Sequence, residues 1–264
     1  MSIHFTKYHG TGNDFVIIDD REESFDGGNI HLINQMCSRR FGIGADGLIL
    51  LRNVPGYDFQ MVYFNSDGNQ STMCGNGGRC IVHFAHSLGI IEDITSFLAI
   101  DGSHVAFVLE DNKIKLKMSD VDQLSNDGKA LVLDTGSPHY VLKVDNVDAV
   151  NVKEEGGAIR YSDKYIKEGI NVNFLECRDN GILVATYERG VEDETYSCGT
   201  GVTAAALSIN KMKPSQYTSP IPIQTKGGKL KVYFTSEEDG YSDIWLEGSA
   251  VVTFYGEWGF DVIT

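Results

Sequence analysis

The segments Met73-Cys74-Gly75-Asn76-Gly77-Gly78 and Ser197-Cys198-Gly199-Thr200-Gly201 carry the same Cys-Gly-x-Gly pattern. Their cysteines lie 124 residues apart (198 − 74 = 124). The same offset relates Thr11-Gly12-Asn13 to Thr135-Gly136-Ser137, and Tyr63 to Tyr187. Because the offset is close to half of a 264-residue chain, the pattern predicts two similar domains of ordinary size.

The boundary between the halves is predicted from composition. The stretch 120–128 is rich in Asp, Asn and Ser and lacks an apolar run, as linkers do. We therefore place the first domain at residues 1–120 and the second at 121–251.

Overall charge and composition exclude several classes of function. A net charge of −15 argues against nucleic-acid binding, which needs clustered Lys and Arg. The first residues form no secretory signal, and no apolar run is long enough to span a membrane. Five cysteines, an odd number in a chain this long, do not form a disulfide framework. These features predict a cytoplasmic protein.

Hydrophobic periodicity predicts the same series of elements in each half. In the first half we expect strands at 15–19, 48–51, 59–64, 105–110 and 114–118, and helices at 29–41 and 79–88. In the second we expect strands at 131–134, 140–144, 172–177 and 182–187, helices at 161–168 and 202–210, and an alternating β-rich tail at 221–254. The helices that follow the two cysteines are apolar almost all round, so each is buried. The predicted fold is α/β (α+β), with each half a curled, mostly antiparallel sheet around one central helix and the active site in the cleft between the halves.

A cysteine at a helix start suits proton transfer. The partial positive charge of a helix N-terminus favours the thiolate, and glycines let a ligand carboxylate approach the backbone N–H groups. Two such thiols, Cys74 and Cys198, would take and return a proton on opposite faces of one carbon without a cofactor.

The other cysteines have a simpler interpretation. Cys37, Cys80 and Cys177 lack this setting and are interpreted as packing residues. Cys80, His83 and His86 are spaced three apart on one predicted helix, but no Cys-x-x-Cys or His-Glu-x-x-His pattern accompanies them, so no metal site is predicted.

The chain resembles the diaminopimelate epimerases over essentially its whole length. The resemblance rests on the segments 9–15, 42–47, 64–68, 73–80, 136–139, 187–190 and 197–201. It implies two pseudo-symmetric α/β domains, a final strand, 252–264, that returns to the first domain, and commonly a homodimer. The implied reaction is the cofactor-independent interconversion of LL- and meso-diaminopimelate, for lysine and peptidoglycan precursors.

The resemblance also implies roles for individual residues. It assigns the acid–base pair to Cys74 and Cys198. It assigns substrate contacts to the side chains of Asn13, Asn65, Asn171, Glu188 and Arg189, and to the backbone at Gly75, Asn76, Gly199 and Thr200. His139 and Glu188 are expected to tune thiol ionisation. The chain departs from the family pattern at Gly47, where many relatives carry Gln, and at Ser137, where many carry Asn.

Other functions remain open at this stage. A proline racemase or hydroxyproline epimerase uses a similar pair of thiols, but typically has His where this chain has Asn76, and its small substrate gives Arg189 no distal group to bind. Phenazine-type isomerases do not use the paired thiols. A thiol redox protein and a non-catalytic amino-acid-binding module are the alternatives from other classes.

Overall fold

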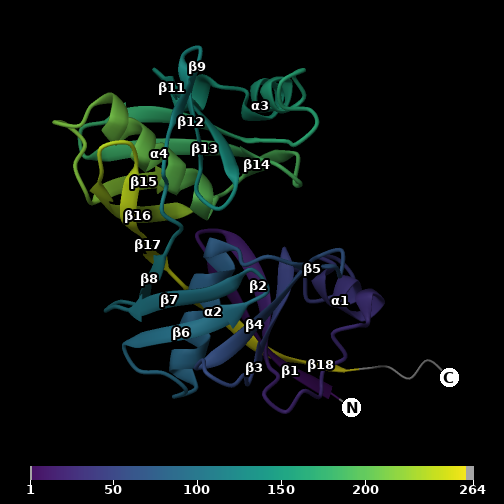
Figure 1. Cartoon of the computed structure of the whole chain (residues 1–264). Helices are drawn as coiled ribbons and strands as arrows, with labels where there is room; N and C mark the ends of the chain where they lie inside the picture. Colours follow the sequence, from purple (N-terminus) through teal and green to yellow (C-terminus); the bar gives the residue numbers. More distant parts are fainter. Residues whose placement is uncertain (1, 260–264) are drawn as a thin grey trace. The chain divides into compact units, whose positions relative to one another are not determined.

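The computed structural model describes residues 2–259 and divides them into two compact units. The first unit comprises residues 2–116 and 249–259, and the second comprises residues 117–248. Figure 1 shows both units.

The first unit contains nine strands and two α-helices among its described residues. The strands are β1 (Ser2–Gly10), β2 (Asn13–Asp19), β3 (Gly47–Arg52), β4 (Phe59–Asn65), β5 (Gln70–Ser71), β6 (Ile94–Ala99), β7 (Gly102–Val108), β8 (Lys113–Lys117) and β18 (Val251–Gly259). The helices are α1 (Ile30–Cys37) and α2 (Gly75–Ser87).

Most strand pairs in this unit are antiparallel. β2 and β3 are parallel, as are β4 and β6, whereas β1–β2, β3–β4, β6–β7 and β7–β8 are antiparallel. β18 pairs with the outer edge of β1, from Ser2 opposite Gly259 to His9 opposite Val251. The end of the described chain therefore completes the unit in which the chain begins.

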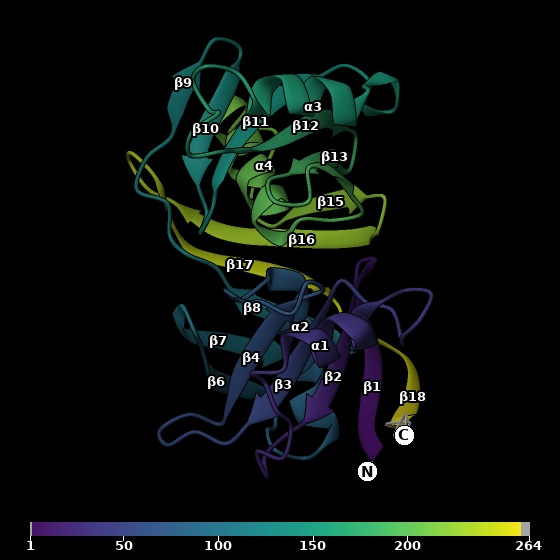
Figure 2. The ribbon, with the colours of Figure 1, turned by 90° about the vertical axis from the view of Figure 1, so that its right-hand side faces the viewer.

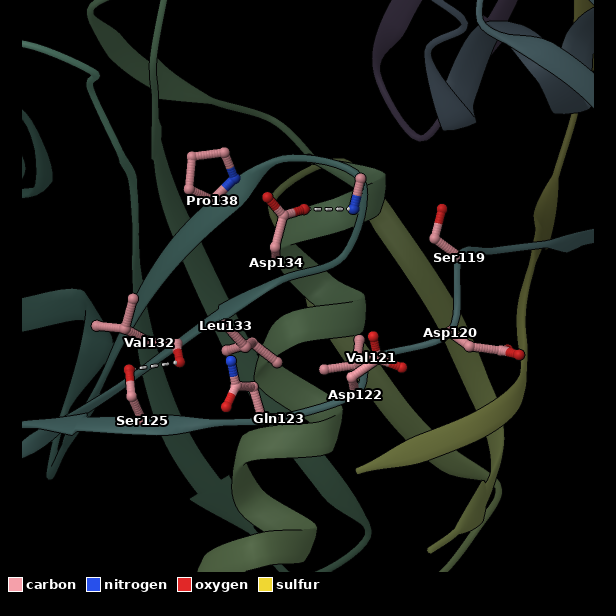
Figure 3. Close-up of a pocket in the computed structure, with 11 residues that line it drawn as sticks. Ser119, Asp120, Val121, Asp122, Gln123, Ser125, Val132, Leu133, Asp134 and Pro138 are labelled. Carbon is pink, nitrogen blue, oxygen red and sulfur yellow. Dashed lines mark hydrogen bonds between the residues drawn. The ribbon is translucent and has the colours of Figure 1, made fainter. Parts of the chain in front are cut away.

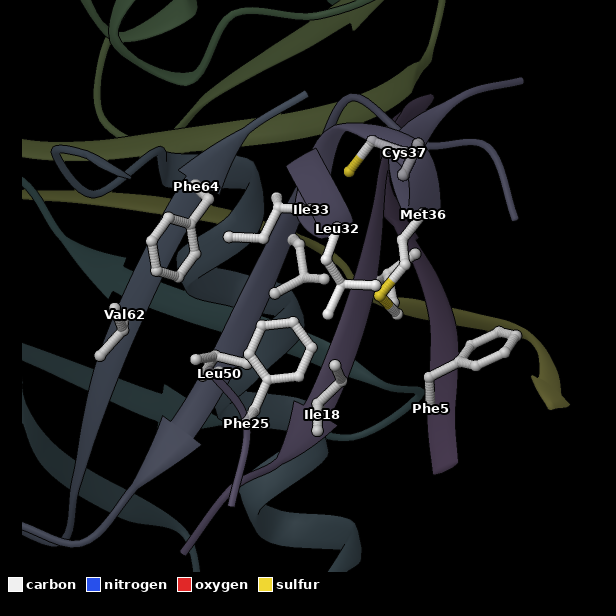
Figure 4. Close-up of a cluster of buried hydrophobic side chains, with 13 residues drawn as sticks. Phe5, Ile18, Phe25, Leu32, Ile33, Met36, Cys37, Leu50, Val62 and Phe64 are labelled. Atoms are coloured by element: carbon white, nitrogen blue, oxygen red, sulfur yellow. The ribbon is translucent and has the colours of Figure 1, made fainter. Parts of the chain in front are cut away.

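The two helices lie on opposite faces of the β1–β4 sheet. Leu32, Ile33 and Met36 of α1 pack against Ile18 and Leu50, as Figure 4 shows. α2 contacts β1–β4 and β7 (Figure 2). Because successive strand side chains alternate between faces, buried residues on both faces make near-continuous apolar runs such as Phe15–Ile18.

The second unit repeats this series. Its strands are β9 (Ser125–Asp127), β10 (Ala130–Asp134), β11 (Pro138–Val144), β12 (Asn171–Arg178), β13 (Gly181–Glu188), β14 (Asp193–Thr195), β15 (Ile221–Thr225), β16 (Gly228–Ser236) and β17 (Tyr241–Ser249). Its helices are the short 3₁₀ turn η1 (Val147–Ala149), α3 (Val152–Arg160) and α4 (Gly199–Met212).

Strand pairing follows the same order in both units. β11–β12 and β13–β15 are parallel, and β10–β11, β12–β13 and β15–β16 are antiparallel. In the first unit Phe15 lies opposite Gly47, and in the second His139 lies opposite Asn171, each partner 124 positions further along the chain. α4 contacts β10–β13, β15 and β16, so it occupies the position that α2 has in the first unit.

Four helix predictions need correction. The helix predicted at 29–41 spans only Ile30–Cys37, and residues 38–41 are not helical. The helix predicted at 161–168 is wrong, because this segment forms turns that end at Gly169 (φ +76°), and the helix is α3, eight residues or so upstream. The helices predicted at 79–88 and 202–210 begin earlier, at Gly75 and Gly199. Glycine is a weak helix former, so helix propensity alone does not predict the Gly-rich first turns as helical. Each helix therefore begins directly after its cysteine.

None of the helices in residues 2–259 is long and apolar enough to cross a membrane.

Candidate active site

Both predicted catalytic cysteines are helix N-cap residues. Cys74 precedes α2 with an extended backbone (φ −96°, ψ 130°), and Cys198 precedes α4 in a similar conformation (φ −114°, ψ 117°). Neither side chain caps the first turn of its helix. Cys74 is half-buried and Cys198 is buried. Each thiol thus lies at the positive end of a helix dipole, where an anion is stabilised.

In the first unit, two asparagines surround the Cys74 thiol. Cys74 Sγ donates to Asn13 Oδ1 at 3.5 Å, and Asn76 Nδ2 donates to the same oxygen at 3.2 Å. Asn13 Nδ2 donates in turn to Asp46 Oδ2 at 2.7 Å. The structure therefore brings together three predicted site residues, Cys74, Asn13 and Asn76, and adds Asp46, which the sequence did not point to.

Arg79 is a second residue that sequence reasoning missed. Its side chain is fully buried and donates to Asn76 Oδ1 (3.0 Å), Thr11 Oγ1 (3.2 Å) and Gly75 O (3.2 Å), near the start of α2. Burial lowers the pKa of its guanidinium, and no carboxylate of the described residues lies within ion-pair distance. The sequence contained one signal for Arg79: it is a charged residue within a helix that is predicted to be buried on almost all sides.

A cluster of charged groups holds Asp46 and Asn13 in place. Lys7 and Arg39 bind Asp14 at 2.6 Å and 2.7 Å, and Arg39 also binds Asp46 at 2.6 Å. Burial would raise the pKa of Asp14, but the hydrogen bonds from Arg39 and Lys7 outweigh it and lower that pKa to about 2. Asp14 therefore remains a carboxylate at neutral pH.

The surroundings of Cys198 are different. Its Sγ lies 3.4 Å from Thr200 Oγ1, and a hydroxyl donates or accepts as the sulfur requires. Thr135 Oγ1 donates to Thr200 O at 2.9 Å. Thr203 stands where the first unit has Arg79, and its hydroxyl donates to Gly199 O at 2.9 Å. The start of α4 is thus neutral at the position where α2 carries a buried cation.

Asn171, Ser137 and Arg189 form a connected group in the second unit. Asn171 Nδ2 and Arg189 Nη2 both donate to Ser137 Oγ, at 2.9 Å and 3.3 Å. The Arg189 backbone N–H donates to Asn171 Oδ1 at 2.9 Å, and Arg189 Nη1 donates to Glu168 O. Glu188 is the last residue of β13 and directly precedes Arg189. Ser137 thus keeps a polar role in spite of its departure from the family pattern.

His139 is fully buried in β11. Burial, and then the charge of Arg189, lower its pKa to about 3, so the imidazole is neutral at neutral pH. Its Nδ1 lies 3.0 Å from Asn173 Nδ2, while its Nε2 makes no hydrogen bond within the described residues.

Asn65, a predicted site residue, and Gly47, where the chain departs from the family pattern, lie apart from these networks. Asn65 is exposed at the end of β4, opposite Gly47. At Gly47 a Cβ would lie 2.4 Å from Phe64 O and 2.5 Å from Tyr63 Cε2. The Tyr63 ring therefore occupies the space that a larger side chain at position 47 would need.

Cys37, Cys80 and His83 have structural surroundings. Burial raises the pKa of Cys37 and of Cys80 to about 12, which keeps both as thiols. His83 Nδ1 lies 2.9 Å from Tyr8 Oη, and its Nε2 lies 3.1 Å from Asn112 Oδ1.

A pocket of the second unit lies beside the turn between β10 and β11 (Figure 3). It has a volume of about 600 Å³ and is lined by the segment 119–125 and by residues from Val132 to Pro138. None of the predicted site residues lines it. The Asp134 carboxylate accepts from Gly136 N at 2.8 Å and so shapes the turn that precedes Ser137.

A family model described as "Diaminopimelate epimerase" matches residues 5–130 and again residues 131–252. The chain belongs to the diaminopimelate epimerase family. This is a family of isomerases. A diaminopimelate epimerase from Flavobacterium psychrophilum is 51% identical over 249 residues, which cover 94% of this chain and 97% of the relative. One from Aquifex aeolicus is 36% identical, over an alignment that covers 99% of this chain and 99% of the relative.

Solved structures with low sequence identity share the fold. A phenazine biosynthesis protein of the PhzF family from Bacillus anthracis superimposes with a TM-score of 0.79 at 15% identity, over 98% of this chain and 100% of that one. A hydroxyproline epimerase from Agrobacterium vitis, solved with bound trans-4-hydroxy-L-proline, gives 0.68 at 13% identity, over 100% and 92%. With the two family matches, these confirm the predicted α+β fold of two similar domains.

Proposed function

We propose that this chain interconverts LL- and meso-diaminopimelate, with Cys74 and Cys198 as the two acid–base groups. One observation carries the proposal: each of the two units has a cysteine as the N-cap residue of its central helix. Membership of the diaminopimelate epimerase family supports the choice of substrate. The product serves lysine and peptidoglycan precursor synthesis, a cytoplasmic role.

The proposed reaction moves one proton off the α-carbon and another onto it. A thiolate takes the α-proton and becomes a thiol, and the electron pair of the broken C–H bond delocalises into the adjacent carboxylate. The second thiol then gives its proton to the opposite face and becomes a thiolate. The carbon is inverted, and charge and electron count are conserved. In the reverse direction the two sulfurs exchange roles, and no cofactor is required.

Charge that develops on the carboxylate must be stabilised where it forms. In the proposal, the backbone N–H groups at Gly75–Asn76 and Gly199–Thr200 perform this task. The helix N-termini favour it, since their unpaired N–H groups and dipoles bind anions.

The distal end of the substrate needs different partners. Arg189 binds the second carboxylate through its guanidinium, while Glu188 and the amide oxygens of Asn13, Asn65 and Asn171 accept from ammonium groups. His139 and Glu188 adjust thiol ionisation. We also propose that two copies of the chain form a homodimer, that the domains are 1–120 and 121–251, and that a C-terminal strand within 252–264 joins the first. The residues 260–264 lie outside the described part of the chain.

Proton NMR in deuterium oxide tests the proposal directly. Reduced protein is incubated with LL-diaminopimelate, and in parallel with L-proline. Loss of the α-proton signal together with formation of the meso isomer is the expected result. Exchange with proline alone would assign the chain to the racemase group instead. No exchange with either substrate, in protein whose thiols titrate as reduced, would overturn the proposed activity.

A further inference from the structure

His139 and Asn173 form a buried pair on neighbouring strands of the second unit. Both side chains are fully buried, and His139 Nδ1 lies 3.0 Å from Asn173 Nδ2. The family resemblance assigns no role to Asn173. A neutral imidazole carries its proton on one nitrogen only, so the partner of Nδ1 decides which nitrogen that is.

Neighbouring groups orient the Asn173 amide. Its Nδ2 lies 3.3 Å from the carbonyl oxygen of Tyr140, and its Oδ1 accepts from Thr186 Oγ1 at 2.9 Å. In the flipped orientation, two oxygens without hydrogens would face each other at Tyr140, which is unfavourable. The first turn of α4 also packs on this amide, because a Cβ at Gly201 would lie 2.4 Å from Asn173 Oδ1.

The orientation of the amide decides the tautomer of the imidazole. An amide nitrogen only donates, so His139 Nδ1 must accept, and the proton of the neutral ring lies on Nε2. Arg189 is the charged group that acts on this ring, and its positive charge opposes protonation. The Nε2–H is buried without an acceptor among the described residues. A buried donor without a partner is unfavourable, so binding of a group that accepts from this Nε2–H is favoured.

We propose that Asn173 is a positioning residue that holds His139 as the neutral Nε2–H tautomer. His139 then acts as a hydrogen-bond donor and not as a base. Its acceptor is an anion of the reaction, a thiolate or a carboxylate, and this last step alone rests on the proposed function. A donor lowers the free energy of such an anion, whereas a base would compete with the thiols for the proton.

Nitrogen NMR of protein labelled with ¹⁵N-histidine tests the tautomer without any need for activity. The variant His139→Gln identifies the resonances of His139 among the seven histidines. At pH 7 we expect the Nε2 shift of a protonated nitrogen and the Nδ1 shift of an unprotonated one. An Nδ1–H tautomer, or an imidazolium, would overturn the proposal.

The variant Asn173→Asp tests the role of the amide. A carboxylate accepts from Nδ1–H, so the proton should move to Nδ1, and kcat/KM for α-proton exchange should fall at least tenfold with an altered pH profile. Asn126→Asp adds the same charge on exposed β9 and should leave both the His139 shifts and exchange unchanged. If Asn173→Asp does not fold, the variant Thr186→Ser is used instead. It keeps the hydroxyl that donates to Asn173, so His139 must remain the Nε2–H tautomer. A ring still protonated on Nε2 in Asn173→Asp would refute the role of Asn173.

Discussion

Arg79 is a charged side chain in a place where charge is costly. A buried ion costs several kcal/mol, and hydrogen bonds to a charged group return about 1.5–3 kcal/mol each. Arg79 makes three such bonds, all to neutral oxygens, and one of them orients Asn76 beside Cys74. The equivalent Thr203 carries no charge. The two thiols therefore sit in different electrostatic surroundings.

Removing the Arg79 charge should slow thiol chemistry at Cys74. In Arg79→Met we expect iodoacetamide to alkylate Cys74 about tenfold more slowly at pH 7, because a cation favours the reactive thiolate. Arg79→Lys should retain most of the rate. Thr203→Val, at the matching position of α4, should not change the alkylation of Cys74. Rates are measured by mass spectrometry on protein with a native circular dichroism spectrum, and an unchanged rate in Arg79→Met would contradict the role.

Each catalytic thiol should be indispensable on its own. Cys74→Ala and Cys198→Ala should each lose epimerisation below detection, since one sulfur cannot act on both faces of the carbon. Cys177→Ala removes a thiol outside both networks and should keep turnover close to that of the unmodified protein. The assay follows formation of the meso isomer. Full turnover by either of the first two variants would rule out the two-base mechanism.

At the scale of single elements, α3 contains two adjacent glycines in different surroundings. A Cβ at Gly156 would lie 2.4 Å from Tyr187 Cβ, whereas one at Gly157 would meet only the Tyr187 ring, at 3.7–3.9 Å. Gly156 is what allows α3 to approach β13 closely.

The two positions should respond to alanine in opposite ways. Gly156→Ala should lower the free energy of unfolding by about 1–3 kcal/mol through overpacking. Gly157→Ala should raise it by up to about 1 kcal/mol, since alanine is the better helix former. Urea unfolding followed by circular dichroism measures both. Equal effects of the two substitutions would mean that α3 does not pack on Tyr187.

The same helix shows what the sequence could and could not predict. The motifs around Cys74 and Cys198 are local, and their glycines and offset were enough to place both thiols at helix starts. Helix propensity does not predict α3, because the helix contains two glycines. Its position is decided by tertiary packing on Tyr187. Applying the 124-residue offset to the helix predicted from Asn29 would have pointed close to α3. The polar contacts of Arg79, Asp46 and Asn173 depend on which strands become neighbours. The alternation of apolar and polar residues along a strand does not show which strands these will be.

For the whole molecule, stability should fall in acid. The folded-state pKa of Asp14 is about 2, against an ordinary value of 3.8, so its contribution of about 2 kcal/mol is complete above about pH 5 and is lost as the pH falls towards 2. His139 acts in the same direction: its pKa falls from 6.5 to about 3, so the unfolded chain binds a proton first as the pH drops below 6.5.

The variant Asp14→Asn isolates the first of these contributions. It should be less stable than the unmodified protein at pH 6, and the difference in free energy of unfolding should shrink between pH 4 and pH 2. Urea unfolding at a series of pH values gives both curves. A difference that stays constant over this interval would show that Asp14 does not titrate as described.

Ligand binding should also change the molecule as a whole. A weak carbon acid reacts best when water is excluded, so we expect the two domains to close on diaminopimelate. Small-angle X-ray scattering of the Cys74→Ala protein, with and without substrate, should show a smaller radius of gyration in the complex. An unchanged radius at saturating substrate would count against closure.

The pairing of β18 with β1 has a consequence for how the chain is made. A ribosome releases β1 long before β18, although the two are neighbouring strands of one sheet. The second unit, residues 117–248, is complete before β18 emerges. Domains usually fold in order from the N-terminus, but here the later unit has all of its strands first. A nascent chain stopped short of residue 251 would carry β1 as an exposed edge that invites wrong pairing, so the first unit is completed only after β18 has emerged.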